Sequence, residues 1–204
     1  MNRKLKILAF AGSLRGKSFN KRVLQTAIKG AQNAGAEVTL VDLRDYPMPL
    51  FNSDDEATFG IDENAVRFQG LLTEHDGFLI TSPEYNGSLS GALKNAIDWA
   101  SRPSDKYKRS DIFQGKFAAI MTASPGSFGG VRVLSHMRDV LTSIGVYVLP
   151  TEIAVSFAGE KFSGDDEEMI DERTKGVLEN LGAALVAMLR KTHGEIKFMS
   201  NTSG

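Results

Sequence analysis

The 204-residue sequence predicts an α/β protein in which a parallel sheet has helices on both faces. Two observations lead to this fold class. Short apolar runs alternate with helical patterns from one end of the chain to the other. The runs are continuous rather than alternating, as expected for strands covered on both faces. The length allows a substantial core, so we expect a single domain over residues 1–204.

The first half of the chain predicts two strands and two helices. The segment "KILAF" (6–10) is a short apolar run, typical of a buried parallel strand. A helix begins at Ser18 and ends before Gly35. Its apolar stripe consists of Leu24, Ala27, Ile28 and Ala31. Residues 37–43 are rich in β-branched side chains and predict the second strand. A polar loop, "NSDDEATFG", then leads to a helix over Glu63–Glu74.

The second half predicts three more strands and three more helices. The strands cover 77–82, 116–124 and 146–155, and Pro150 breaks the last of them. The helix that follows the first of these strands has its apolar stripe at Leu93, Ala96, Ile97 and Ala100. The next helix, which stops at Gly145, has its stripe at Leu134, Met137, Leu141 and Ile144. The closing helix is lined by Leu178, Leu181, Leu185 and Met188. The tail "THGEIKFMSNTSG" is expected to be frayed.

Five strands alternating with five helices leave few topologies, because crossovers between parallel strands are right-handed. At this size the flavodoxin-like strand order 2-1-3-4-5 is the common one, which predicts a three-layer α/β/α sandwich with a five-stranded parallel sheet. Ligands of such sheets bind at the carboxyl ends of the strands, where the strand order reverses. The loops after the first, third and fourth strands are therefore expected to carry the function.

Composition excludes several classes of protein. A formal charge of −1 gives no sign of a nucleic-acid or membrane-surface binder, and no stretch approaches the ~18 apolar residues of a membrane span. There is no cysteine, which excludes disulfides and thiolate chemistry and suits a cytoplasmic location. The three histidines, His75, His136 and His193, are far apart and show no metal-ligand spacing, so no metal site is expected.

The first of the three loops contains "AGSLRGKS", which fits the P-loop pattern G-x-x-x-x-G-K-[ST] except that Ala11 replaces the first glycine. In a P-loop NTPase or kinase, Lys17 would reach the β/γ-phosphates and Ser18 would hold Mg²⁺. Asp42, at the end of the second strand, would complete the metal site. Ala11 counts against this interpretation, because a glycine there provides tight backbone curvature.

The same loop also suits a single terminal phosphate. Ser13, Ser18 and Asn20 offer side-chain hydrogen bonds, and Arg15 offers a cationic fork that neutralises a phosphate monoester. The backbone N–H groups and the dipole at the start of the following helix favour an anion at the same place. A third interpretation is a plain strand–helix turn with Ser18 as the N-cap.

The second loop lies within "TSPEYNGSLSGALKNAIDWAS". Pro83 restricts the chain just after the strand, and Asn86 and Gly87 form a turn dipeptide that tolerates positive φ. The turn can present N–H and C=O groups to the edge of a planar heterocycle, with Tyr85 packed against the ring. Alternatively, Glu84 and Asn86 only hold the loop.

The third loop, "TASPGSFGGVRV", follows the fourth strand. Its glycines allow a ligand to approach the backbone closely, and Ser124 and Ser127 add small donors. The alternative is a flexible connector between strand and helix.

Together, "AGSLRGKSFN" and "SPEYNGSLSGALKNAIDW" resemble the motifs of the NADPH-dependent FMN reductase family, which includes quinone, azo-dye and chromate reductases. The resemblance covers essentially the whole chain in order and spacing. It implies that the FMN phosphate is held by Ser13, Arg15, Ser18 and Asn20. It implies contacts to the isoalloxazine and ribityl groups from Pro83, Glu84, Tyr85, Asn86 and Gly87. It implies that the third loop flanks the flavin through Ser124, Gly126, Gly129 and Gly130. Lys17 falls at a variable position of the pattern.

The resemblance implies an oxidoreductase in which hydride passes from NADPH or NADH to FMN, and electrons then pass to a quinone, an azo compound, a metal ion or free flavin. The cofactor carries this chemistry, so no side chain needs to be catalytic. Family members commonly assemble as dimers or tetramers with the flavin near subunit interfaces, and we expect a homotetramer. Two alternatives are a flavodoxin-type electron carrier without a nicotinamide site and the P-loop NTPase or kinase. Carriers are usually strongly acidic, unlike this chain.

Overall fold

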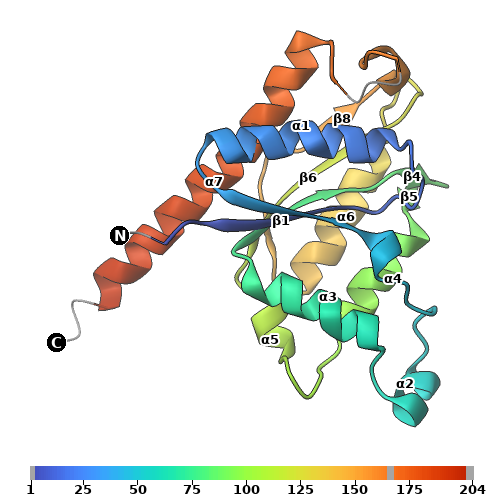
Figure 1. The fold of residues 1–204 in the computed structure, drawn as a ribbon, viewed down its shortest axis with the longest axis vertical. Coiled ribbons are helices and arrows are strands. Elements are labelled where there is room, and N and C mark those ends of the chain that lie inside the picture. The colour runs from blue at the N-terminus through green and yellow to red at the C-terminus, as the bar shows by residue number, and fades with distance from the viewer. Residues whose placement is uncertain (1–2, 165–167, 201–204) are drawn as a thin grey trace.

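The computed structural model describes residues 3–164 and 168–200, and its centre is a parallel sheet (Figure 1). The strands run side by side in the order β2-β1-β3-β6-β7, and the short strand β8 also pairs with β6. Their bounds are β1 Lys6–Ala11, β2 Glu37–Asp42, β3 Gly77–Thr81, β6 Phe117–Ala123, β7 Tyr147–Val148 and β8 Ile153–Val155. The predicted order 2-1-3-4-5 is confirmed, and Pro150 separates β7 from β8 as the expected break.

Helices cover both faces of the sheet (Figure 1). The side chains of β1 alternate between two hydrophobic clusters: Ile7, Ala9 and Ala11 face one, and Leu8 and Phe10 face the other. On the first face lie α1 (Phe19–Asn33) and α7 (Glu172–Ser200). On the second face lie α3 (Glu63–Glu74), α4 (Gly91–Ala100) and α6 (Val131–Ser143). This arrangement is the predicted three-layer sandwich.

Helices α1 and α7 pack with their backbones in close contact. A Cβ atom at Gly30 would lie 2.0 Å from the carbonyl oxygen of Glu179, and one at Gly182 would lie 2.1 Å from that of Ala27. Only glycine permits this approach. The helical backbone of α7 continues to Ser200, so the expectation of a frayed tail was wrong for residues 192–200.

Two short helices were missed by the sequence analysis. The segment interpreted as a polar loop contains α2 (Ser53–Phe59), and α5 (Arg109–Ile112) precedes β6. The side chain of Asn52 accepts a hydrogen bond from the backbone of Asp54, and three acidic residues occupy the first turn of α2. Because α2 has no buried residue, it lacks the apolar stripe on which the prediction depended.

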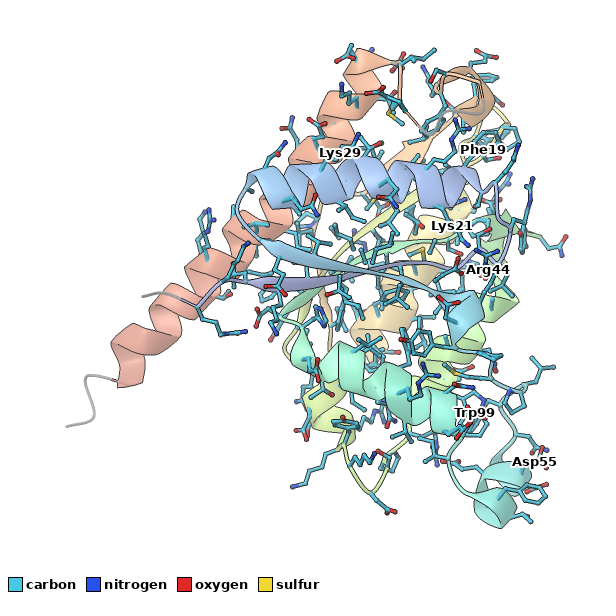
Figure 2. All side chains as sticks on the ribbon, viewed as in Figure 1. Phe19, Lys21, Lys29, Arg44, Asp55 and Trp99 are labelled. Carbon is cyan, nitrogen blue, oxygen red and sulfur yellow. The ribbon has the colours of Figure 1, made fainter. Side chains whose placement is uncertain are left out.

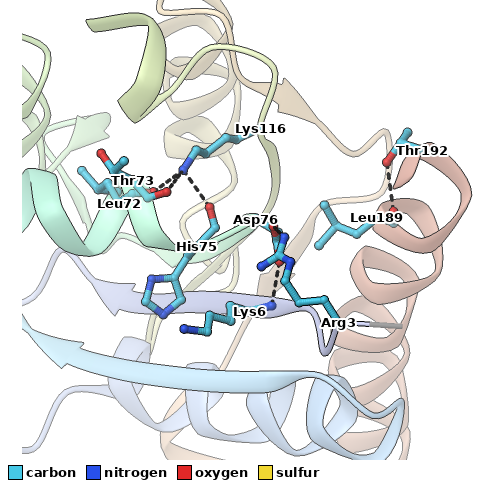
Figure 3. Close-up of polar contacts among 9 residues, drawn as sticks. All are labelled: Arg3, Lys6, Leu72, Thr73, His75, Asp76, Lys116, Leu189 and Thr192. Atoms are coloured by element: carbon cyan, nitrogen blue, oxygen red, sulfur yellow. Dashed lines mark hydrogen bonds and ion pairs between the residues drawn. The ribbon is translucent and has the colours of Figure 1, made fainter. Parts of the chain in front are cut away.

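The amino end of the sheet is held by a set of polar contacts (Figure 3). Lys116 Nζ donates to the carbonyls at the end of α3, including those of Thr73 at 2.9 Å and His75 at 2.7 Å. Burial lowers the pKa of Lys116 to about 8. Asp76 accepts from the backbone of Lys6 at 2.8 Å and pairs with Arg3. These contacts lie at the edge opposite the predicted ligand site and serve the fold.

Candidate functional site

Three loops meet at the carboxyl edge of the sheet, beside the hairpin labelled β4 and β5 in Figure 1. We call residues 12–18 after β1 loop 1, residues 82–90 after β3 loop 2, and residues 124–130 after β6 loop 3. Because β1, β3 and β6 are neighbours in the sheet, their loops lie together. This is the edge that strand order predicted for a ligand.

Loop 1 is fastened to loop 2 through Gly12. The N–H of Gly12 donates to the carbonyl of Thr81 at 2.7 Å, and its own carbonyl accepts from Ser90 Oγ at 2.5 Å. A Cβ atom at Gly12 would lie 2.7 Å from Cβ of Leu93, closer than packed atoms allow. Ser90 Oγ also accepts from Leu93 N and so caps α4. Gly12 was not singled out by sequence reasoning, although "AGS" places a glycine there.

The amino terminus of α1 is open to an anion. Ser18 occupies the N-cap position, yet its side chain makes no capping hydrogen bond, and the first turn contains no acidic residue. By contrast, Asp62 caps α3 by accepting from two backbone N–H groups. Ser18 and, in the preceding loop, Ser13 are buried residues, 4% and 1% exposed. The Ser18 side chain therefore does not cap α1, as the plain N-cap interpretation would require. A bound anion could instead accept from the first N–H groups of the helix.

Arg15 supplies a cation in loop 1. It is exposed, and within residues 3–164 and 168–200 its guanidinium makes no hydrogen bond or ion pair. Its backbone N–H lies 3.4 Å from Ser13 Oγ, a long hydrogen bond. A guanidinium without a protein partner beside an uncapped helix start can neutralise a bound phosphate.

Asp42 does not form the metal site of a P-loop. Lys21 Nζ lies 2.6 Å and Arg44 Nη2 2.7 Å from Asp42 Oδ2, and Figure 2 shows both cations at the same end of the sheet. Burial opposes ionisation of Asp42, but the hydrogen bonds from Arg44 and Lys21 outweigh it and hold the pKa of the carboxyl well below its ordinary value. Among the described residues no group of three metal-ligating side chains occurs. The carboxylate is neutralised by protein cations.

Asn20, in the first turn of α1, joins that helix to the end of β6. Its side-chain nitrogen donates to the carbonyl of Ala123 at 2.9 Å, and its side-chain oxygen accepts from the N–H of Ala123 at 3.1 Å. Thr81 Oγ1 donates to the Asn20 carbonyl at 3.2 Å, which adds β3 to the same junction. One amide N–H of Asn20 is left for a ligand, because the NH₂ group has two hydrogens.

Loop 2 is a tight hairpin. β4 (Glu84–Tyr85) pairs antiparallel with β5 (Ser88–Leu89), and Asn86 and Gly87 turn the chain at φ 52° and φ 80°. The expected positive-φ turn is confirmed. Tyr85 is 50% exposed at the edge of the site, whereas Pro83 is buried. The carboxylate of Glu84 points away to Arg132 on α6, which supports the loop-holding alternative for this side chain.

Loop 3 contains two glycines with left-handed backbone, Gly129 at φ 62° and Gly130 at φ 86°. A Cβ atom at Gly130 would lie 2.6 Å from Thr122 Oγ1, and one at Gly129 would lie 2.8 Å from the backbone of Ser156. Both glycines are thus required by packing within the protein. Gly126 is exposed, and its N–H donates to Ser124 Oγ at 3.2 Å.

The donor set fits a flavin mononucleotide. Two buried hydroxyls, an uncapped helix start and Arg15 suit a terminal phosphate, while the hairpin and loop 3 offer backbone groups and Tyr85 to a planar ring. The sequence profile of the NADPH-dependent FMN reductases matches residues 5–160, which include all three loops.

The chain belongs to the NADPH-dependent FMN reductase family.

Relatives support this membership. An NAD(P)H-dependent FMN reductase of Pseudomonas aeruginosa is 36% identical over 95% of this chain and 100% of its own length. A quinone reductase of Escherichia coli is 33% identical over 92% of this chain and 95% of its own length. In solved structures, a flavoenzyme NAD(P)H:(acceptor) oxidoreductase of Paracoccus denitrificans superposes with a TM-score of 0.77 at 28% identity, covering 92% of this chain and 98% of its own. The resemblance found in the sequence is confirmed.

As a member of the FMN reductase family, the chain is an oxidoreductase with FMN as cofactor and NAD(P)H as co-substrate. The P-loop and carrier alternatives are thereby set aside. In the described part of the chain, no helix has the length and apolar character to cross a membrane.

Proposed function

We propose that this chain holds FMN in loops 1 to 3 and uses it to transfer hydride from NAD(P)H to a quinone. The observation that carries the proposal is the uncapped start of α1, together with the buried residues Ser13 and Ser18 and with Arg15 in the same loop, whose guanidinium has no partner among the described residues. These groups together form an anion site at the edge where family members are expected to bind their cofactor.

Each loop has a different task in this proposal. Ser13, Ser18 and Arg15 bind the terminal phosphate and fix its direction, and Asn20 adds its remaining amide N–H. The hairpin residues 83–87 and the loop 3 residues Ser124, Gly126, Gly129 and Gly130 line the two sides of the ring. Bound FMN supplies the hydride chemistry at its N5 atom. Backbone N–H groups of the loops would stabilise negative charge on the ring, and the chemistry requires no side chain as an acid or base.

A quinone is the proposed acceptor because the rim of the site is apolar. Exposed apolar side chains occur in loops 1, 2 and 3 and in the segments next to loop 3 and β8; they are Leu14, Tyr85, Phe128, Val131 and Phe157. Such side chains favour a flat apolar acceptor over a hydrated metal oxyanion. The relative from Escherichia coli is named a quinone reductase, which agrees with this choice.

We also propose that the chain forms one domain over residues 1–204, assembles as a homotetramer and resides in the cytoplasm. Leu50 and Phe59 are each 82% exposed near α2, which supports an assembly that covers them. The absence of cysteine suits a reducing compartment. Sedimentation at several concentrations tests the tetramer, and a monomer at all concentrations would overturn it.

Steady-state kinetics test the proposed reaction. The protein is purified, its visible spectrum is recorded, and NADPH and NADH are each oxidised with a quinone panel, an azo dye and chromate as acceptors. We expect flavin absorption bands after reconstitution with FMN and a higher kcat/KM for quinones than for the other acceptors. Chromate or azo-dye reduction at higher kcat/KM would refute the acceptor assignment. A FMN-loaded protein that oxidises neither nicotinamide would refute the enzyme itself.

A further inference from the structure

The hairpin of loop 2 is held from outside the three loops by the first turns of α6. The carboxylate of Glu84 accepts two hydrogen bonds from Arg132: from its backbone N–H at 3.0 Å and from Nη1 at 3.0 Å. One turn later, Nδ1 of His136 lies 2.9 Å from Oγ of Ser88, on the other strand of the hairpin. Arg132 and His136 are four residues apart and so share one face of the helix. We call these four residues the hairpin brace.

Glu84 also serves as the cap of α6. Gly130 stands at the N-cap position and has no side chain to accept from the first N–H groups of the helix. The Glu84 carboxylate fills this role through the N–H of Arg132, where the helix dipole favours a negative charge. Of the helix starts at this edge of the sheet, that of α6 carries a protein carboxylate and that of α1 carries none. The Glu84 carboxylate would repel a phosphate from the start of α6, which favours the start of α1 as the phosphate site.

Glu84 and Arg132 differ in how far their side chains are buried. The side chain of Glu84 is 13% exposed and that of Arg132 is 61% exposed. The Glu84 carboxylate is therefore held in place by its two hydrogen-bond donors, whereas the Arg132 guanidinium covers it from the solvent side. Arg132 also lies over the ring of Phe128, with 5.3 Å from the guanidinium carbon to the ring centroid. The brace is thereby connected to loop 3, on the opposite side of the proposed ring site.

We propose that Arg132 and His136 are positioning residues that hold the hairpin tip, residues 85–87, at the distance from loop 3 that an isoalloxazine ring requires. The inference rests on the proposed function, because it assumes that the ring lies between loops 2 and 3. The tip turns the chain at Asn86 and Gly87, and Tyr85 and Asn86 are exposed. Its position is therefore set by the strands that precede and follow it, and the brace holds one residue of each.

The proposal separates ring binding from phosphate binding, so paired titrations with FMN and riboflavin test it. Riboflavin has the same ring and ribityl chain but no phosphate. Arg132→Ala removes the Nη1 contact and keeps the backbone N–H, and we expect it to raise the dissociation constants of FMN and riboflavin by the same factor, about two- to fivefold for a pair this exposed. Arg15→Ala should weaken FMN alone. Lys175→Ala, which removes an exposed ion pair with Glu172 on α7, is the matched control and should change neither constant.

Three further measurements distinguish positioning from a general loss of stability. Arg132→Lys keeps the charge and should recover part of the lost affinity. His136→Ala should also weaken both ligands equally, since it acts on the other strand of the hairpin. The fluorescence of bound flavin should rise in Arg132→Ala, because a less constrained Tyr85 quenches the ring less. The thermal midpoint of the ligand-free protein should stay close to that of the wild type.

The outcomes are separable. Equal weakening of FMN and riboflavin with partial recovery in Arg132→Lys supports the brace. Unchanged affinities for both ligands in Arg132→Ala and His136→Ala overturn it while leaving the proposed function intact. Weakening of FMN alone also overturns it, because Arg132 would then contact the phosphate. A wild-type protein that binds neither ligand overturns the proposed function together with this inference.

Discussion

Replacement of Arg15 by alanine tests the phosphate site most simply. Arg15 is the cation placed beside the uncapped start of α1, and among the described residues its guanidinium has no protein partner to lose. The substitution therefore removes a ligand contact without breaking a contact of the fold. Because the residue is exposed on loop 1, we expect no change in the thermal midpoint of the ligand-free protein.

The magnitude follows from the type of bond and its exposure. A hydrogen bond to a charged group is worth about 1.5–3 kcal/mol. Arg15 is exposed to solvent, which screens the interaction and places it at the lower end of that range. A loss of about 1.5–2 kcal/mol corresponds to an increase of about ten- to thirtyfold in the dissociation constant of FMN. Arg15→Lys should recover part of the loss, because it keeps the charge without the planar fork.

Flavin fluorescence titration measures this effect, with riboflavin as the ligand that lacks the phosphate. We expect the FMN affinity to fall and the riboflavin affinity to stay within a factor of about two, a difference of less than 0.5 kcal/mol. The contribution should also shrink in high salt, as it does for exposed charges. Unchanged FMN affinity would show that the phosphate lies elsewhere. Equal weakening of both ligands would show that Arg15 acts on the loop and not on the phosphate.

Three predictions concern the framework around the site. Gly130→Ala should destabilise the protein by about 2–4 kcal/mol in chemical denaturation, because φ is 86° and the new Cβ would meet Thr122 Oγ1. The control Gly176→Ala has open space around it and should stabilise α7 by about 0.5–1 kcal/mol. Equal effects of the two substitutions would contradict the packing argument for Gly130. Burial lowers the pKa of His75 below its ordinary value near 6.5, so the unfolded chain takes up the proton first and the free energy of unfolding should fall as the pH drops below that value. His75→Gln should reduce the slope of the free energy of unfolding against pH, measured by urea denaturation at several pH values. An unchanged slope would show that other groups cause it. Asp42→Asn should lower the free energy of unfolding by about 1–2 kcal/mol at neutral pH. The substitution should also abolish the part of the stability that the wild type loses below about pH 4, because the pKa of Asp42 is held low in the fold. The same loss of stability below about pH 4 in the variant and the wild type would refute this prediction.

Most of the fold could be predicted from the sequence because its apolar patterns are long and regular. The helix Glu63–Glu74 was predicted with its observed bounds; in the structure Asp62 caps its start, and Ala65, Phe68 and Leu72 are among its buried residues. The order of the strands followed from the handedness of crossovers. Helix α2 was missed because it depends on a cap and acidic residues in its first turn, and it buries no side chain that a periodicity could reveal.

The loops of the candidate site could be singled out from the sequence, but the residues that hold these loops in place could not. Loop 1 and loop 2 contain contiguous motifs, so Ser13, Arg15 and the turn at Asn86 could be singled out from neighbouring residues alone. Arg132 could not, because its partner Glu84 lies 48 residues away in the chain and the contact exists only when α6 packs beside the hairpin. Gly12 was missed for the same reason, as its need for glycine comes from Leu93 on α4. The sequence shows residue types, whereas these requirements arise from close approach in space.

Anaerobic stopped-flow mixing of the FMN-loaded protein with NADPH tests directly whether the bound flavin accepts hydride. The account predicts that the visible band of the bound flavin bleaches as hydride is transferred, and that it returns when a quinone is added. The same experiment with Arg15→Ala at saturating FMN should bleach at a similar rate, because this residue binds the phosphate and does not take part in hydride transfer. A wild-type flavin that stays oxidised in the presence of NADPH and NADH would contradict the account.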